Sequence, residues 1–420
     1  MKPLLSVVAL FKNNSSLLAV PATSFGIFLT IAARSHLPAD DLFFFLSAGF
    51  SLCTVFDGGV PYKIPHGGGG RFSTTRACRR VLTNMLKASP FIGIALLTLI
   101  SFSPFAKKST VFEIIAYACL GLLIAIAKVL TDTTRIASMK TTHRVRTDQL
   151  AAAFSVFRLL VVLGVAGSVP YLPVYGLTLV AELYSLCRLS GISIQAAALP
   201  TWSTVRRRTK FDASYIQANL AYNAAFNIDR LAAFYFLPPN LYRGLIGITS
   251  LYNMSILPHK LIENELMFPS TPRTHSSLTQ VVIPAAFCGA GCFGLLISLH
   301  LLGKKFSHET LHAVTFVVAA SWMMITAYYN RLWSISLRDF KISFLAKINL
   351  FASVIAIVAA ATGRELYELL IPTGLLAYSV TNFIGLAVGR LIHKVDLAIY
   401  VAAAAAGGGL AIYVLHFIPG

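Results

Sequence analysis

The sequence predicts an all-α polytopic membrane protein, because it carries few charges, its apolar runs are long, and its basic residues gather in short connections. Of the 420 residues, 56% are hydrophobic and 12% are charged, and the mean hydropathy is +0.72. A soluble chain is usually about 25% charged. With about half that charge, the chain has too little polar surface for a globule in water, so its elements are expected to be membrane-spanning helices.

Apolar windows of about 20 residues, long enough to cross the hydrocarbon core, define the expected helices in chain order. The amino-terminal half contains windows near 15–33, 42–61, 84–105, 111–130, 149–168 and 171–189. The carboxy-terminal half contains windows near 213–237, 241–259, 279–302, 309–330, 347–362, 366–388 and 397–417. Because the last window holds the stretch AAAAAGGG, which packs poorly against lipid, we expect 12 to 13 transmembrane helices.

Membrane topology explains the formal net charge of +19 better than a nucleic-acid partner does. If the amino terminus is cytoplasmic, every connection after an even-numbered span is basic. Examples are RFSTTRACRR (71–80), RIASMKTTHRVR (135–146) and VRRRTK (205–210). Basic loops are retained on the cytoplasmic side during insertion, where they also attract anionic lipid headgroups. We therefore predict membrane lipids as partners and no nucleic acid.

The two halves of the chain show a weak internal repeat. HLPADDLFFFLSAGFSL (36–52) and FLPPNLYRGLIGITSL (236–251) each join the first two spans of a six-span unit, and both contain a Leu-Pro pair. Because six spans return the chain to its starting side, the units are expected to be related by a pseudo-two-fold axis along the membrane normal. The predicted lobes are residues 1–200 and 201–390, with a possible additional helix at 391–420.

The seventh predicted span carries a polar stripe. Asn219, Asn223, Asn227 and Arg230 recur at helical spacing on one face, and Asp229 lies on the adjacent face. Such groups can bond neighbouring membrane helices or line a path for a polar substrate. Three asparagines followed by an arginine favour the path, whereas a structural Asp229–Arg230 salt bridge is the competing interpretation.

Further charged residues lie within or at the ends of other spans. Ser16, Thr23, Thr30 and Arg34 form a second stripe on the first span, which ends at the arginine. Arg158 lies midway along the fifth span, and Glu182 lies in the inner half of the sixth. A charge at the bilayer centre costs about 2.5–3.5 kcal/mol, so such residues usually serve a function. Arginines from both halves suit an anionic substrate, because the guanidinium binds phosphate oxygens bidentately.

Two stretches resemble a known family. LAVPATSFGIFLTIAARSHLPADDLFFFLSAGFSLCTVFDGGVPY (18–62) resembles the opening of polysaccharide-exporter flippases, with an Ala-Arg turn, an acidic link and an Asp-Gly-Gly element. NIDRLAAFYFLPPNLYRG (227–244) resembles their seventh helix and its link. The family is the lipid-linked oligosaccharide (O-antigen type) flippases of the multidrug/oligosaccharidyl-lipid/polysaccharide exporter superfamily, which typically have twelve spans.

This resemblance implies a function, a partner and a location. The expected substrate is an undecaprenyl-diphosphate-linked glycan, moved from the inner to the outer leaflet by alternating access through a cationic cavity in the bacterial inner membrane. Arg34, Asp229 and Arg230 are carried over from the resemblance, while Arg158 rests on its depth and charge alone. A glycan polymerase is a possible partner, Na⁺ or H⁺ a possible coupling ion, and no cofactor is expected.

Two other functions remain open from the sequence. One is a cation-coupled drug antiporter of the same superfamily, and the other is a membrane glycan polymerase or ligase, which would normally need a large extracytoplasmic loop. HETLH (308–312) has the spacing of a zinc-protease motif but lies at an expected helix start, so we predict neither a metal site nor catalytic residues. The expected protein is a transporter and not an enzyme.

Overall fold

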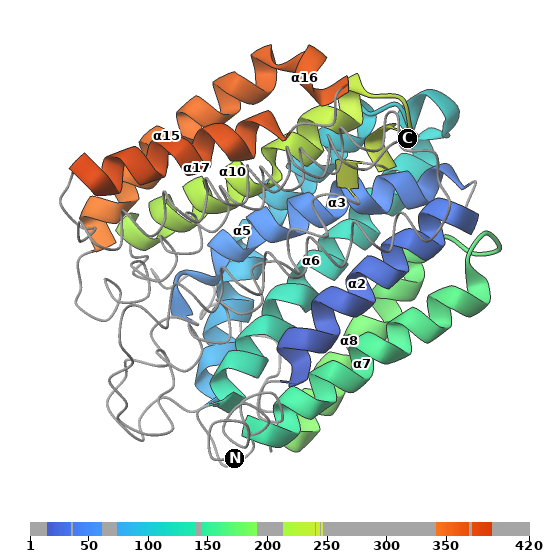
Figure 1. The fold of residues 1–420 in the computed structure, drawn as a ribbon. Helices are drawn as coiled ribbons and strands as arrows, with labels where there is room; N and C mark the ends of the chain where they lie inside the picture. Colours follow the sequence, from blue (N-terminus) through green and yellow to red (C-terminus); the bar gives the residue numbers. More distant parts are fainter. Residues whose placement is uncertain are drawn as a thin grey trace, which may run out of the picture. The chain divides into compact units, whose positions relative to one another are not determined.

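The computed structural model describes residues 15–34, 37–60, 74–139, 144–190, 213–239, 241–243, 245–246, 342–368 and 372–388. Within these ranges the ordered elements are helices, and no strand occurs (Figure 1). The all-α prediction is therefore confirmed for this part of the chain. The later part of the predicted span 241–259, the windows 279–302, 309–330 and 397–417, and the HETLH motif lie outside the described residues.

The helices follow the predicted spans in order. They are α2 (Ser15–Arg34), α3 (Pro38–Cys53), α5 (Thr74–Ser101), α6 (Val111–Met139), α7 (Arg144–Val165), α8 (Tyr171–Leu189), α10 (Ala213–Phe236), α15 (Ile342–Thr362), α16 (Arg364–Glu368) and α17 (Thr373–Val388), with short 3-10 turns η1 (Thr54–Asp57) and η2 (Ala106–Lys108). In the described part, four helical segments are long and apolar enough to cross a membrane: Ala39–Asp57, Thr75–Ser101, Val111–Ser138 and Val145–Val165.

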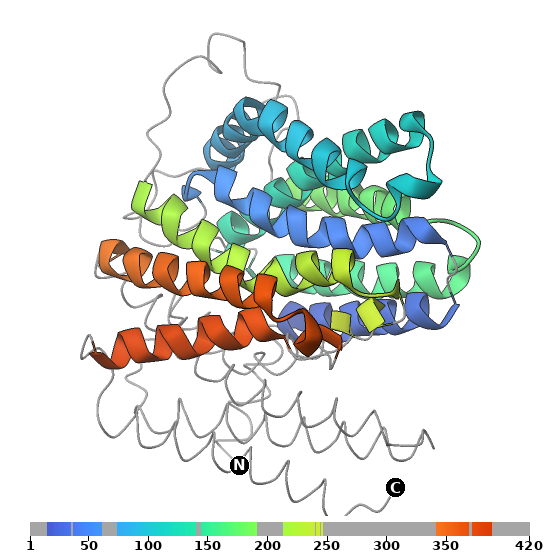
Figure 2. The ribbon, with the colours of Figure 1, turned by 90° about the horizontal axis from the view of Figure 1, so that it is seen from above.

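The chain divides into two compact units, Met1–Asn223 and Ala224–Gly420, and the division falls within α10. In the first unit, α2 packs along α7, α5 along α6, and α6 along α8. In the second unit, α15 packs along α17, as Figure 2 shows. The predicted lobe boundary at residue 200 and the predicted pseudo-two-fold axis stay predictions.

Helix ends in the first unit are fixed by local sequence signals. Thr110 and Glu113 form a capping box at the start of α6: the Thr110 N–H donates to Glu113 Oε2 at 2.7 Å, and the Glu113 N–H donates to Thr110 Oγ1 at 3.3 Å. At α3, Pro38 lies in the first turn, where its missing N–H costs no hydrogen bond. Sequence alone therefore accounts for where these two helices begin.

Other helix ends are fixed by aspartates from neighbouring helices. Asp148 of α7 accepts hydrogen bonds from the Ser15 hydroxyl at 2.7 Å and the Ser16 N–H at 3.0 Å, at the start of α2. Asp40 of α3 accepts from the N–H of Tyr171 at 2.7 Å, at the start of α8. A carboxylate is stabilised there because the first N–H groups of a helix are unpaired and carry partial positive charge. These contacts hold α2 parallel to α7 and α3 parallel to α8, as the predicted topology requires.

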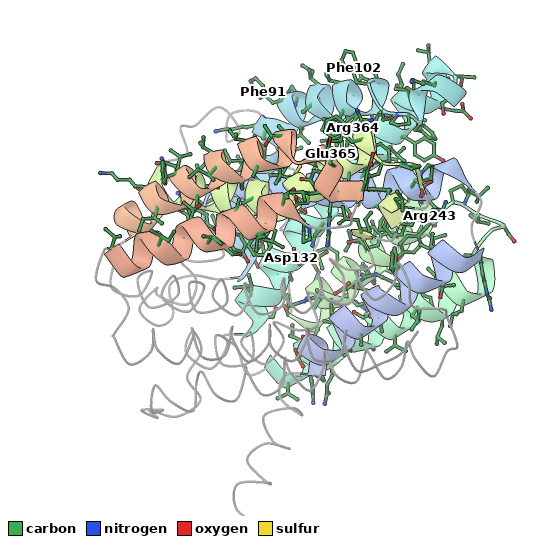
Figure 3. The ribbon with its side chains drawn as sticks, turned by 45° about the horizontal axis from the view of Figure 1, so that its top comes forward. Phe91, Phe102, Asp132, Arg243, Arg364 and Glu365 are labelled. Atoms are coloured by element: carbon green, nitrogen blue, oxygen red, sulfur yellow. The ribbon has the colours of Figure 1, made fainter. Side chains whose placement is uncertain are left out.

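The outer surfaces of α5 and α6 are strongly apolar. Phe91, Phe102 and Phe112 are 73%, 77% and 80% exposed, and Figure 3 shows Phe91 on α5 and Phe102 directly after its end. Monomeric soluble proteins rarely expose contiguous apolar surface of this kind. We interpret this surface as lipid-facing, in agreement with the composition.

Several helix boundaries differ from the windows read off the sequence, and three of the differences concern charged or proline-containing segments. α5 begins at Thr74 instead of near 84, and α6 ends at Met139 instead of near 130, so both helices extend into segments that we assigned to basic loops. The predicted span 366–388 is divided into α16 and α17, with Pro372 directly before α17. Hydropathy windows stop where charges begin, whereas a helix continues when neighbouring helices supply partners for those charges.

Candidate functional site

The carboxy-terminal half of α6 carries three charged side chains on one face, which we call the charged stripe. Lys128, Asp132 and Arg135 are spaced by four and three residues and therefore share one face of the helix. The Lys128 ammonium donates to Asp132 Oδ2 at 3.1 Å, and their side chains are 28% and 37% exposed. Most neighbouring residues of this half of α6 are buried, so the stripe is a polar strip on an otherwise packed helix.

Glu182 of α8 joins this stripe to α7. Its side chain is only 1% exposed, and each carboxylate oxygen accepts from a different arginine. Arg135 Nη2 donates to Oε1 at 2.8 Å, and Arg158 Nη2 of α7 donates to Oε2. One buried carboxylate thus connects α6, α7 and α8. Its two arginine partners lie 47 and 24 residues before it in the sequence.

Arg158 is held on several sides. Besides Glu182, its Nε donates to the Thr178 hydroxyl at 3.1 Å, and its guanidinium lies 5.5 Å from the ring centre of Tyr175. Its side chain is 11% exposed. A guanidinium with this set of contacts is fixed in orientation, because its planar donors match each partner in one geometry.

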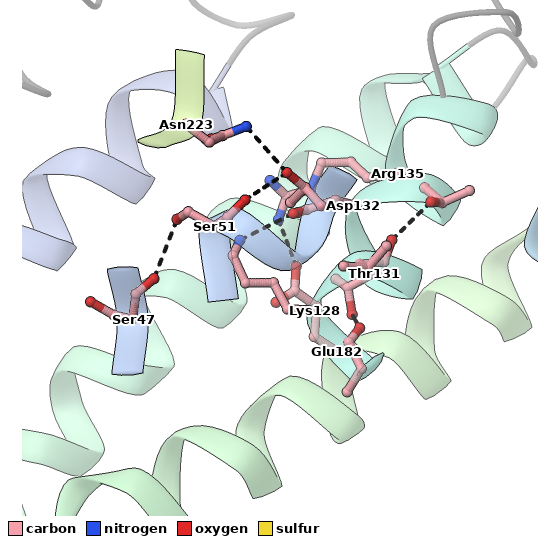
Figure 4. A network of polar contacts seen from close by, with 12 residues as sticks. Ser47, Ser51, Lys128, Thr131, Asp132, Arg135, Glu182 and Asn223 are labelled. Carbon is pink, nitrogen blue, oxygen red and sulfur yellow. Dashed lines mark hydrogen bonds and ion pairs between the residues drawn. The ribbon is translucent and has the colours of Figure 1, made fainter. Parts of the chain in front are cut away.

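Among the ion pairs of this network cations outnumber carboxylates, and Asp148 of α7 also interacts electrostatically with Arg135. Three cations (Lys128, Arg135 and Arg158) face two carboxylates (Asp132 and Glu182), so their formal charges sum to +1. Figure 4 labels four of its members, Lys128, Asp132, Arg135 and Glu182, around the carboxy-terminal half of α6. Exposure falls from Asp132 at one end to Glu182 at the other. The arrangement is therefore a largely buried Arg135–Glu182–Arg158 group next to a partly exposed Lys128–Asp132 pair.

The predicted asparagine stripe begins in the same unit. Asn219 of α10 donates to the Tyr215 hydroxyl at 3.2 Å, and Asn223 donates to Asn219 Oδ1 at 2.8 Å. Asn223 also reaches the Thr54 hydroxyl at 3.4 Å (Figure 4). These contacts confirm that Asn219 and Asn223 share one face of α10. In this arrangement the amides bond to each other and to η1, which is the helix-joining role that the sequence also allowed.

In the second unit, Asp229 is held by the start of α17. Its Oδ1 accepts from the Gly374 N–H at 2.8 Å and the Tyr367 hydroxyl at 2.5 Å, and its Oδ2 accepts from the Leu375 N–H at 2.8 Å. The residue is 2% exposed. Gly374 permits this approach, since a Cβ there would lie 2.7 Å from Ile228 and 3.0 Å from the carboxylate.

The other predicted site residues lie on α2 and α10. Arg34 is exposed at the end of α2, where it donates to the Leu163 carbonyl at 3.2 Å. In the second unit, Asn227 is a buried residue of α10, and Arg230, the residue directly after Asp229, is half-buried. The binding roles of all these residues remain predictions.

Sequence reasoning missed Lys128, Asp132 and Arg135. We assigned Arg135 to a cytoplasmic loop because the apolar window ended near 130, whereas α6 continues through it. The signal was present as charges at i, i+4 and i+7, which is the spacing of one helical face. Among the described residues, no cluster of His, Cys, Asp or Glu is arranged to hold a metal ion.

Comparison with known proteins identifies the fold. No protein-family model matches the chain, and no curated protein matches it. Among solved structures, the chain is similar to the eukaryotic MATE transporter AtDTX14, with a TM-score of 0.58 and 9% identity over 97% of this chain and 99% of that one. Two other MATE structures have lower scores. One, in complex with Br-NRF, scores 0.48 at 14% identity over 93% and 95% of the two chains. The other, an outward-facing multidrug resistance MATE family transporter of the MOP superfamily, scores 0.47 at 12% identity over 97% and 98%.

The likeness to AtDTX14 defines the class of fold. At this identity it extends to the fold alone, which is that of a MATE transporter. Together with the apolar helices, it supports a multi-pass membrane protein.

Proposed function

We propose that this protein is a flippase that moves a polyprenyl-diphosphate-linked oligosaccharide from the inner to the outer leaflet of a bacterial cytoplasmic membrane. The observation that carries the proposal is that cations outnumber carboxylates among the ion pairs of α6, α7 and α8, where three cations face two carboxylates. Cations are costly at this depth, so an excess of them favours an anionic substrate over a cationic one.

A lipid diphosphate fits the chemistry of such a protein. Its headgroup carries oxygens that arginine binds bidentately, and its hydrocarbon tail can remain in the bilayer while the headgroup crosses. The remaining predicted residues have proposed roles in the same path. Arg34 and Arg230 would contact the diphosphate, Asn219, Asn223 and Asn227 would contact sugar hydroxyls, and Asp229 would hold α17 in position.

The proposed mechanism is alternating access. The two proposed six-helix lobes would open in turn to each side, coupled to Na⁺ or H⁺, and a glycan polymerase would use the exported product. A fold built from two repeats, as the sequence predicts, suits this mechanism, because rocking of one bundle against another alternately exposes a site near the membrane midplane.

A cation-coupled drug antiporter is the second candidate. It fits the fold equally well, since the most similar structure reported above is that of a MATE transporter. The observation that favours it is the presence of two deeply buried carboxylates, Glu182 and Asp229. Glu182 is already paired with two arginines and Asp229 with a helix terminus, which leaves neither placed to accept an organic cation in this structure.

Gene deletion followed by analysis of lipid-linked glycans tests the proposal. We expect a polyprenyl-diphosphate oligosaccharide to accumulate in the inner leaflet of the deletion strain and to disappear when the wild-type gene is restored. Restoring Arg230→Lys should give partial export, whereas Arg230→Ala at equal protein abundance should give none, because diphosphate binding needs the charge. A strain with normal glycan export and increased sensitivity to cationic drugs would support the antiporter instead.

A further inference from the structure

Arg135 has an unused hydrogen-bonding capacity. A guanidinium carries five N–H donors, and the bond from Nη2 to Glu182 uses one of them. The Nε of Arg135 is buried and has no hydrogen-bond acceptor in the part of the chain that the structure describes. An unpaired buried donor is costly, so this nitrogen is expected to have a partner in some state of the protein.

The surroundings of Arg135 specify the chemistry of that partner. Lys128, two helical turns earlier on the same face, adds a second cation, and both side chains are partly exposed. Asp132 lies between them and forms an ion pair with Lys128. Asp132 and Asp148 of α7 also interact electrostatically with Arg135, but neither is hydrogen-bonded to it among the contacts of the described residues. Two cations and a spare donor on one face suit a multidentate anion such as phosphate or diphosphate.

The depth of the stripe indicates where such an anion would bind. Arg135 lies four residues before the end of α6, and Lys128 lies eleven residues before it. At 1.5 Å per residue, the two positions are about 6 and 16 Å from that helix end. In the predicted topology α6 ends at the cytoplasm, so the stripe runs from the inner interface toward the bilayer centre.

We propose that Arg135 and Lys128 form the site that receives a phosphate-class anion from the cytoplasmic side, and that Arg158 is a positioning residue which holds Glu182 against Arg135. The proposal rests on the proposed function for the identity of the natural anion. Arg158 is fixed by Glu182, Thr178 and Tyr175. Glu182 therefore orients Arg135, and it also lowers the positive potential that an incoming anion meets.

This division of roles predicts opposite effects for two substitutions. Removing the Arg135 charge deletes the anion's ligand, so binding weakens. Neutralising Glu182 removes a negative charge next to the same ligand, so binding tightens. If the network only joins helices, both substitutions lower thermal stability, and neither has a systematic effect on anion affinity.

Binding to the full-length purified protein in lipid nanodiscs tests the proposal, with inorganic pyrophosphate as the free anion and farnesyl diphosphate as the lipid-linked one. We expect both to bind wild type, with Arg135→Gln weakening binding by about 10- to 100-fold and Arg135→Lys retaining most of it. Glu182→Gln should tighten binding. Arg188→Gln, at an exposed arginine of α8, is the matched control and should leave affinity unchanged. Farnesol controls for binding of the tail alone.

The outcomes separate this inference from the proposed function. The proposed anion site is wrong if the wild-type protein binds neither probe, or if wild type and Arg135→Gln bind them equally well. This holds even if deletion of the gene blocks glycan export. Arg135-dependent binding without any glycan phenotype keeps the anion site and overturns the flippase. If Glu182→Gln does not fold, the comparison of Arg135→Gln with Arg135→Lys decides, since a site that does not recognise charge would not distinguish them.

Discussion

Glu182 and Asp229 are both buried carboxylates in membrane helices, but the protein stabilises them in different ways. Glu182, in the first unit, is bound by two guanidiniums. Asp229, in the second unit, is bound by two backbone N–H groups at the start of α17 and by the Tyr367 hydroxyl. The first carboxylate is bound by charged side chains of two other helices, and the second is bound mainly by the backbone.

This difference separates two roles for buried charge. Backbone donors at a helix terminus cannot leave without moving the helix, so Asp229 is suited to positioning α17. Arginine side chains can exchange one anion for another without a change in the backbone, so the Glu182 network is suited to binding. Asp40 and Asp148, which hold the starts of α8 and α2, belong with Asp229.

The largest expected effect is the loss of stability in Asp229→Ala. Two N–H groups and a phenol hydroxyl would lose a charged acceptor in a buried site, which costs roughly 3–5 kcal/mol in total. We expect a large fall in the apparent Tm of the purified protein, with Glu365→Ala, at an exposed carboxylate of α16 (Figure 3), as the unaffected control. An unchanged Tm for Asp229→Ala would remove its positioning role.

The next effect compares Glu182→Gln with Asp229→Asn. Glu182→Gln leaves two arginines without a counter-charge and should cost about 2–4 kcal/mol. Because added anions can compensate those arginines, its Tm should recover when ionic strength is raised from about 0.1 to about 1 M. The hydrogen-bond donors to Asp229 are uncharged, although Arg230 also interacts with it electrostatically, so the Tm of Asp229→Asn should recover less. Equal salt responses would contradict the distinction between the two carboxylates.

Gly374→Ala tests the close contact that brings α17 to Asp229. Its Cβ would meet Ile228 at 2.7 Å, the Asp229 carboxylate at 3.0 Å and the Ala356 carbonyl at 3.1 Å. Overpacking of this kind costs about 1–3 kcal/mol, seen as a lower Tm. Gly164→Ala on α7 is the matched control, since nothing lies within 4 Å of a Cβ there. If Gly374→Ala matched that control, α17 would not need its close approach.

The smallest effect is expected for Asp132→Asn. Its partner Lys128 is one turn away on the same helix, and both side chains are partly exposed. Such pairs contribute about 0.3–0.5 kcal/mol, so the Tm should change little. If the Tm fell as much as in Glu182→Gln, Asp132 would contribute as much to the stability of the protein as the buried Glu182 does.

Much of the secondary structure was predictable because it depends on local sequence. The limits of α8 agree with the predicted window 171–189, and α2 and α10 differ from theirs by one residue. The shared face of Asn219 and Asn223 follows from helical spacing alone. The depth of Arg158 and Glu182 also marked them as unusual, although their pairing was not predicted.

The sequence by itself determined that this chain is a helical membrane protein, since its apolar runs fix both the helices and their burial in lipid. Only the tertiary structure decided which charges belong together. Asp229 finds its partners 138 to 146 residues away, and Glu182 finds Arg135 in a segment whose polarity we interpreted as a loop. The physical reason is that hydropathy measures the cost of burying each residue alone, whereas a buried charge is stabilised by partners that only packing brings into contact.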